Sequence, residues 1–99
     1  MTQLLTDEEI VDRLRDCDWS RDGREIVRDL KLANFAEAIA LVNRIAEVAE
    51  ARNHHPDILV HDYNQLRVSV TNHAAGGLTD ADFELARAID DLVGRGEPR

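Results

Sequence analysis

Cysteine and proline are scarce in this chain of 99 residues, which contains one of the first and two of the second. With Cys17 alone, neither an intramolecular disulfide nor a cysteine-based zinc site can form, and we expect a small buried side chain there. No apolar run approaches the roughly 20 residues of a transmembrane helix, and the first residues lack the basic and apolar parts of a signal peptide. We therefore expect no membrane association and a cytoplasmic location.

Basic residues are also few: 12 lysines and arginines stand against 20 aspartates and glutamates, giving a formal net charge of −8. Such a surface repels a phosphate backbone and an anionic membrane, so nucleic-acid and membrane partners are disfavoured. The sequence also lacks a G-x-S-x-G nucleophile elbow, an H-E-x-x-H zinc motif and a glycine-rich phosphate loop. A small, neutral or weakly polar ligand remains compatible with this composition.

The composition that is present belongs to an ordinary globular protein, with 43% hydrophobic and 32% charged residues. Its length predicts one domain over residues 1–99, because a single core is usually built from about 100 to 150 residues. So small a core leaves apolar surface uncovered, which favours a homo-oligomer.

Three segments combine helical apolar spacing with capping residues, and they cover about residues 7–16, 34–50 and 79–94. The first begins with a capping box at Thr6 and Glu9, and Asn34 caps the second, which is the longest. Gly94 is expected to end the third helix and to leave residues 95–99 as a frayed tail.

Strand-like segments lie between these helices in two pairs. A polar turn at residues 20–24 leads into residues 25–32, and residues 58–60 and 66–70 flank a second turn at 62–64. Strands joined by short turns pair antiparallel, with helices packed against one face. The sequence therefore predicts an α+β domain of order α-β-β-α-β-β-α, with a four-stranded antiparallel sheet and three helices on one face.

Histidines carry the strongest functional signal, since both protonation states of an imidazole are accessible near neutral pH. His54 and His55 are adjacent after the long helix, and Pro56 favours an extended backbone, in which neighbouring rings point to opposite sides. Glu50 precedes His54 by four residues, so we expect its carboxylate to lie close to that ring. His73 follows the last strand, where it can return toward His54.

Asp82 lies in the first turn of the last helix and completes a set of three histidines and two acids at one rim of the sheet. Such a set suits general acid–base catalysis without a covalent nucleophile. A metal site built from the three histidines is the alternative, but adjacent side chains diverge and rarely chelate one ion. His61 lies beside a turn, and we expect it to be exposed to solvent.

The spacing of these residues resembles the pterin-4a-carbinolamine dehydratase family. The matching pattern begins at Glu50-x3-His54-His55-Pro56 and continues through Tyr63 and His73 to Asp82. Matching residues flank this pattern along most of the chain, at Leu4, Thr6, Glu8, Glu9, Trp19, Asn53, Asp57, Gly76, Gly77, Leu78, Thr79, Leu85, Ala86, Ile89 and Asp90.

The resemblance implies removal of water from 4a-hydroxytetrahydrobiopterin to give quinonoid dihydrobiopterin, in tetrahydrobiopterin recycling, without a metal or cofactor. It also implies a homodimer or homotetramer. The family's catalytic histidines correspond to His54, His55 and His73, and substrate-binding or supporting roles fall to Glu50, Asn53 and Asp82. We assign His54 and His73 as the acid–base pair and His55 to binding or orienting the pterin.

Relatives of this fold also include partners of a transcription factor and assembly factors of a large enzyme. A non-catalytic protein-binding or assembly module is therefore the alternative, although degenerate members tend to lose histidines that this chain keeps. The chain departs from the family pattern beside its third histidine. Asn72 and Ala74 replace a usual threonine and an acidic or small polar residue there, so we expect the surroundings of His73 to differ.

Overall fold

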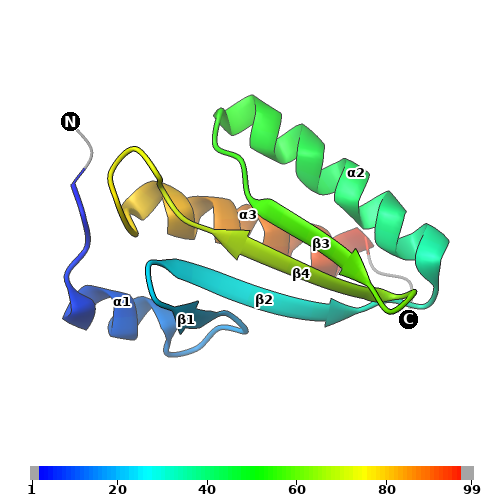
Figure 1. The fold of residues 1–99 in the computed structure, drawn as a ribbon, viewed down its shortest axis with the longest axis horizontal. Coiled ribbons are helices and arrows are strands. Elements are labelled where there is room, and N and C mark those ends of the chain that lie inside the picture. Colours follow the sequence, from blue (N-terminus) through cyan, green and yellow to red (C-terminus); the bar gives the residue numbers. More distant parts are fainter. Residues whose placement is uncertain (1–2, 97–99) are drawn as a thin grey trace.

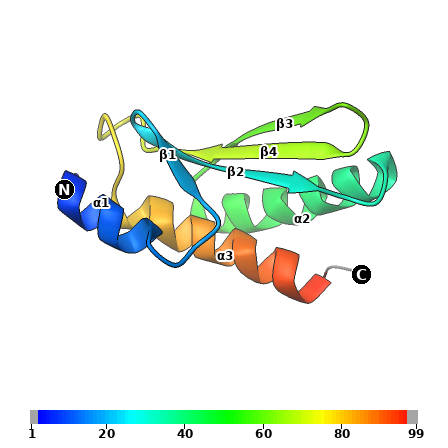
Figure 2. The same ribbon diagram turned by 90° about the horizontal axis from the view of Figure 1, so that it is seen from below.

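The computed structural model describes residues 3–96, as three α-helices and a four-stranded antiparallel sheet in the predicted order (Figure 1). The helices are α1 (Asp7–Leu14), α2 (Phe35–Arg52) and α3 (Asp80–Gly96). The strands are β1 (Ser20–Asp22), β2 (Glu25–Lys31), β3 (Asp57–His61) and β4 (Gln65–Val70). All three helices lie on the same side of the sheet (Figure 2), which confirms the predicted α+β fold.

The sheet has the strand order β1-β2-β4-β3, so the last strand in sequence lies between β2 and β3. Ile26 of β2 pairs with Val70 of β4, and Asp57 of β3 pairs with Ser69. The start of β3 and the end of β4 therefore lie side by side. The segment that precedes β3 and the segment that follows β4 therefore leave the sheet at the same end of these two strands.

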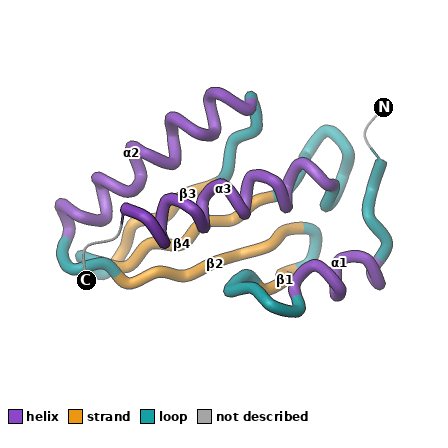
Figure 3. The backbone as a smooth tube through the Cα atoms, turned by 180° about the vertical axis from the view of Figure 1, so that it is seen from behind, coloured by secondary structure: helices purple, strands orange, loops and turns teal. Residues whose placement is uncertain are grey.

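The core lies between the sheet and helices α2 and α3, which run side by side across one sheet face (Figure 3). Alternate residues of β4 are buried, in keeping with the period of a strand that has one covered face. On the helices, Leu41 and Ile45 of α2 and Leu85 and Ile89 of α3 are fully buried, each pair four residues apart. Burying one such side chain stabilises the fold by about 1.5–3 kcal/mol.

Helix boundaries differ from the predicted ones at three C-terminal ends. Helix α1 stops at Leu14, two residues early, while α2 continues past Glu50 to Arg52. Gly94 does not end α3, which runs on to Gly96; a glycine stops a helix mainly by adopting a left-handed backbone, and Gly94 does not adopt one. The predicted frayed tail is thus wrong at residues 95–96, and its remainder, residues 97–99, lies outside the described part of the chain.

The β1–β2 hairpin replaces part of the predicted turn at residues 20–24. Ser20–Asp22 form strand β1, and the turn itself is only Gly23-Arg24, where Gly23 has a φ of 64° that glycine adopts without steric cost.

Two further expectations concern Cys17 and membrane spans. Cys17, which was expected to be buried, is exposed. No helix within residues 3–96 has the length and apolar character needed to span a bilayer.

Candidate functional site

The C-terminus of α2 determines how the two adjacent histidines are presented. Asn53 caps the helix in a left-handed conformation with φ 51°, and its N–H donates to the carbonyls of Ala49 and Glu50. The His54 N–H also donates to the Ala49 carbonyl, at 3.1 Å. Asparagine tolerates this conformation better than most residues, so the chain reverses here at low cost. Asn53, a predicted supporting residue, thus acts on the backbone next to the histidines.

His54 points inward and contacts Asp82 at the start of α3. Its Nε2 lies 2.6 Å from Oδ1 of Asp82, whose side chain is completely buried, while 16% of the His54 side chain remains exposed. An ionised carboxylate only accepts hydrogen bonds, so a neutral imidazole in this position has its proton on Nε2 and its lone pair on Nδ1. The pairing of His54 with Asp82 orients the ring and fixes its tautomer.

Asp82 has a second role in the same position. Its other oxygen, Oδ2, accepts hydrogen bonds from the N–H of Thr79 at 2.7 Å and from the Thr79 hydroxyl at 3.0 Å. This carboxylate therefore caps α3 with one oxygen and contacts His54 with the other. The residue that caps α3 and the predicted site residue are therefore one side chain.

His55 points outward and contacts Glu50. Its Nε2 lies 2.6 Å from Oε2 of Glu50, and the two side chains are 55% and 76% exposed. The prediction that Glu50 would lie close to His54 is wrong. Residues four apart are neighbours only while a helix continues, and α2 ends at Arg52, before the left-handed turn.

His73 lies in the loop that follows β4. Asn72 closes this loop: its carbonyl accepts from the N–H of Gly76 at 2.9 Å, and its side-chain oxygen accepts from the N–H of Ala75 at 3.0 Å. Asn72 also forms an isolated β-bridge with Gly77. The departure from the family pattern at Asn72 is thus a structural element of the loop that carries His73.

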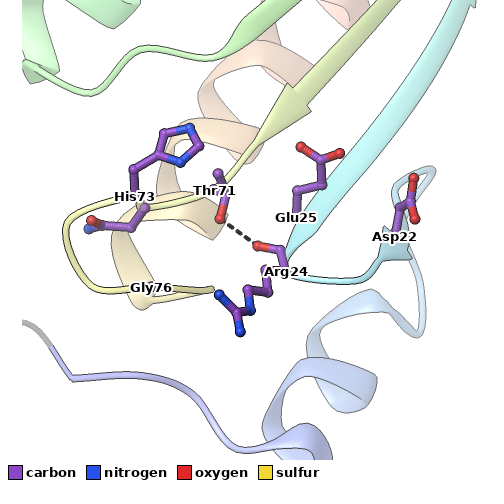
Figure 4. A pocket seen from close by; sticks show the side chains of 7 residues that line it. Asp22, Arg24, Glu25, Thr71, His73 and Gly76 are labelled. Carbon is purple, nitrogen blue, oxygen red and sulfur yellow. Dashed lines mark hydrogen bonds between the residues drawn. The ribbon is translucent and has the colours of Figure 1, made fainter.

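A pocket of about 390 Å³ opens beside His73 (Figure 4). Its lining residues are Asp22, Arg24, Glu25, Thr71, Asn72, His73 and Gly76. They come from the β1–β2 hairpin and from the loop after β4, and the Thr71 hydroxyl donates a hydrogen bond to the Arg24 carbonyl between these two walls. The volume is within the range of small-molecule sites, which is about 300–1,000 Å³.

Sequence reasoning did not identify Asp22, Arg24 or Glu25 as site residues. The polar turn in which they lie was visible in the sequence. Only the antiparallel pairing of β2 with β4 places that turn next to His73, and strand order could not be read from the spacing of residues.

The predicted site residues fall into two groups, and both groups lie at the same end of strands β3 and β4. His54 and His55 precede β3 and His73 follows β4, so the pairing of Asp57 with Ser69 keeps the two segments at the same end. Within residues 3–96 no hydrogen bond joins His73 to either of the other two. In the same range, no three His, Cys, Asp or Glu side chains are grouped as metal ligands.

The family model described as pterin 4 alpha carbinolamine dehydratase matches residues 3–92. The chain belongs to this family. A protein of Chloroflexus aurantiacus, provisionally named pterin-4-alpha-carbinolamine dehydratase, is 50% identical over 91 residues, covering 91% of this chain and 97% of that protein. A Nocardia farcinica protein with the same provisional name is 48% identical over 93 residues, covering 93% and 97% of the two chains.

Solved structures extend these similarities to three dimensions. A transcriptional coactivator/pterin dehydratase from Brucella melitensis superposes with a TM-score of 0.84 at 31% identity, covering 91% of this chain and 98% of the other. A pterin dehydratase-like protein identified as a RuBisCO assembly factor in the alpha-carboxysome has a TM-score of 0.65 at 18% identity, covering 80% and 93%. At 18% identity, the second similarity shows only that the two chains share a fold.

Proposed function

We propose that this chain dehydrates 4a-hydroxytetrahydrobiopterin to quinonoid dihydrobiopterin by histidine acid–base catalysis, in tetrahydrobiopterin recycling. The observation that supports this most directly is the His54–Asp82 pair, a partly exposed imidazole held by a fully buried carboxylate. Family membership supports the substrate class, and the pocket beside His73 has the volume for a small heterocycle.

The reaction needs two proton transfers. The C4a–O bond breaks as the departing hydroxyl gains a proton and leaves as water, while a proton is removed from a ring nitrogen. In our proposal His54 is the base, because the Asp82 carboxylate stabilises the imidazolium that forms on it. His73 is then the acid, and His55, paired with Glu50, binds or orients the pterin.

A stopped-flow assay of 4a-hydroxytetrahydropterin decay tests this proposal. We expect the wild-type protein to accelerate decay, and His54→Ala and His73→Ala each to lower the rate by about 10²- to 10⁴-fold. His61→Ala is the control, because His61 contacts Asp62 at the far end of β3. Near-wild-type rates in both histidine variants, with circular dichroism confirming the fold, would contradict the histidine mechanism.

A non-catalytic protein-binding module is the second candidate. It is supported by two proteins with this fold, one a transcriptional coactivator/pterin dehydratase and the other a RuBisCO assembly factor. The net charge of −8 would suit a basic partner surface. Absence of any acceleration at micromolar protein would favour this candidate over the enzyme.

We also propose a homodimer or homotetramer. Phe35 and Leu59 are each 53% exposed, and a second copy could cover such apolar side chains. Analytical ultracentrifugation measures the oligomeric state, and a monomer at micromolar concentration would contradict this proposal.

A further inference from the structure

The pocket beside His73 contains three charged side chains without an ionic partner. Asp22, Arg24 and Glu25 line it, and none of them forms a salt bridge with any residue in the described range 3–96. Of these three, Glu25 alone is half-buried, and the other two are exposed. Arg67 of β4, by contrast, donates two hydrogen bonds to Asp29. Charges that line a pocket and lack a protein partner are free to bind a ligand.

The backbone holds Glu25 in a defined place relative to His73. Glu25 is the first residue of β2, directly before the pairing of Ile26 with Val70, and it is half-buried. The hydrogen bond from Thr71 to the Arg24 carbonyl ties this end of β2 to the loop that carries His73. In Figure 4 the Glu25 carboxylate and the His73 ring lie on either side of Thr71 and project in the same direction.

The 2-amino-4-oxopyrimidine edge of a pterin complements a carboxylate at this place. Its 2-amino group and its N3–H are two parallel donors, and a carboxylate offers two parallel acceptors in a bidentate arrangement. Hydrogen bonds to an ionised acceptor are about twice as strong as neutral ones. Resting on the proposed function, we propose that Glu25 recognises this edge and orients the bicyclic ring so that its C4a hydroxyl faces the histidines.

The inference makes Glu25 a specificity-determining residue rather than a proton carrier. An analogue without the 2-amino group leaves one carboxylate oxygen without its donor, and sites that hydrogen-bond a ligand group discriminate strongly against analogues lacking it. Glutamine at this position keeps the shape of the side chain but offers one acceptor and one competing donor.

Titration calorimetry with 7,8-dihydrobiopterin and with the same compound lacking its 2-amino group tests the inference. We expect the wild-type protein to prefer the 2-amino compound by at least about 10-fold. Glu25→Gln should weaken binding of that compound by about 10- to 100-fold and remove the preference. In the decay assay Glu25→Gln should raise KM more than it lowers kcat.

Glu47→Gln is the matched control, since Glu47 is an exposed glutamate of α2 outside the pocket. It makes the same change of charge and should leave affinity and preference as in the wild type. Unchanged affinity and preference in Glu25→Gln, in a protein that still accelerates decay, would overturn the role of Glu25 and leave the dehydratase proposal standing. A wild-type protein that neither binds dihydrobiopterin nor accelerates decay would overturn both.

Discussion

His54 and His55 are adjacent in sequence and have the same 2.6 Å separation from a carboxylate oxygen, yet they lie in opposite environments. The His54 side chain is 16% exposed and faces Asp82, which is fully buried, whereas His55 and Glu50 are both largely exposed. The distance alone does not show which pair contributes more to stability. Water competes with the outer pair and screens it, while the inner carboxylate has no solvent to replace a lost partner.

The inner pair is also connected to the fold and the outer pair is not. Asp82 joins the start of α3 to the loop after α2, because it holds Thr79 and His54 at once. Glu50 and His55 are five residues apart in one local segment. Loss of the inner contact should therefore affect both stability and chemistry, and loss of the outer contact should affect chemistry alone.

The largest effect is expected from Asp82→Ala. The substitution leaves the buried Thr79 N–H and hydroxyl and the His54 ring without an acceptor, so the free energy of unfolding should fall by about 3 kcal/mol. Urea denaturation measures it. Asp80→Ala is the control, since Asp80 is an exposed acid of the same helix turn that pairs with Arg13, and it should cost less than about 1 kcal/mol. Equal losses in the two variants would contradict the claim that the burial of Asp82 makes its contacts costly to lose.

Asn53 is expected to give the next largest effect, because its left-handed backbone ends α2 directly before the two histidines. Asn53→Ala should lower the free energy of unfolding by about 1 kcal/mol, while Asn53→Gly should match or exceed the wild type. Thermal denaturation of both variants measures the difference. An alanine variant as stable as the glycine variant would show that the left-handed conformation carries no cost here.

Glu50→Gln should change stability least among the site variants, by less than about 0.5 kcal/mol, because both members of its pair are exposed. A lower rate of dehydration with unchanged stability would agree with a role of His55 in orienting the pterin. A loss above about 1 kcal/mol in urea denaturation would contradict the weak coupling of the outer pair to the fold.

The smallest effect is expected at the exposed ion pair between Arg67 and Asp29 on the open face of the sheet. Two hydrogen bonds from the Arg67 guanidinium hold the pKa of Asp29 below its ordinary value of 3.8. A carboxyl whose folded pKa is lowered stabilises the fold above its unfolded pKa and loses that contribution as pH falls through the folded pKa. Arg67→Ala should raise the Asp29 pKa toward 3.8 in a carboxyl NMR titration. An unchanged pKa would contradict the assigned cause.

Local patterns in the sequence predicted the elements well. The capping box at Thr6 is present with both of its hydrogen bonds, of 2.8 and 3.1 Å, and Asn34 caps α2 as predicted. These signals succeed because a cap involves residues only three apart, whose geometry depends on little else. Gly94 failed as a stop signal because α3 continues through it without a left-handed residue.

Residues of the candidate site were chosen from the sequence, but several of their contacts were not foreseen. His54 and Asp82 were both chosen from the sequence, but their pairing joins residues 28 apart and depends on how α3 packs. Glu50 was matched to the wrong histidine because helical spacing was extended past the end of α2. Glu25 was not chosen, since its place beside His73 depends on the pairing of β2 with β4.

The sequence by itself determined the order of helices and strands, the family and the histidines that it retains. These follow from periodicity, caps and spaced motifs, which are properties of short segments. Only the tertiary structure decided that Asp82 belongs to His54, that Glu50 belongs to His55 and that the β1–β2 hairpin lines a pocket with His73. The physical reason is that these contacts depend on how α3 packs, on where α2 ends and on which strands pair, and the spacing of residues in the sequence sets none of the three.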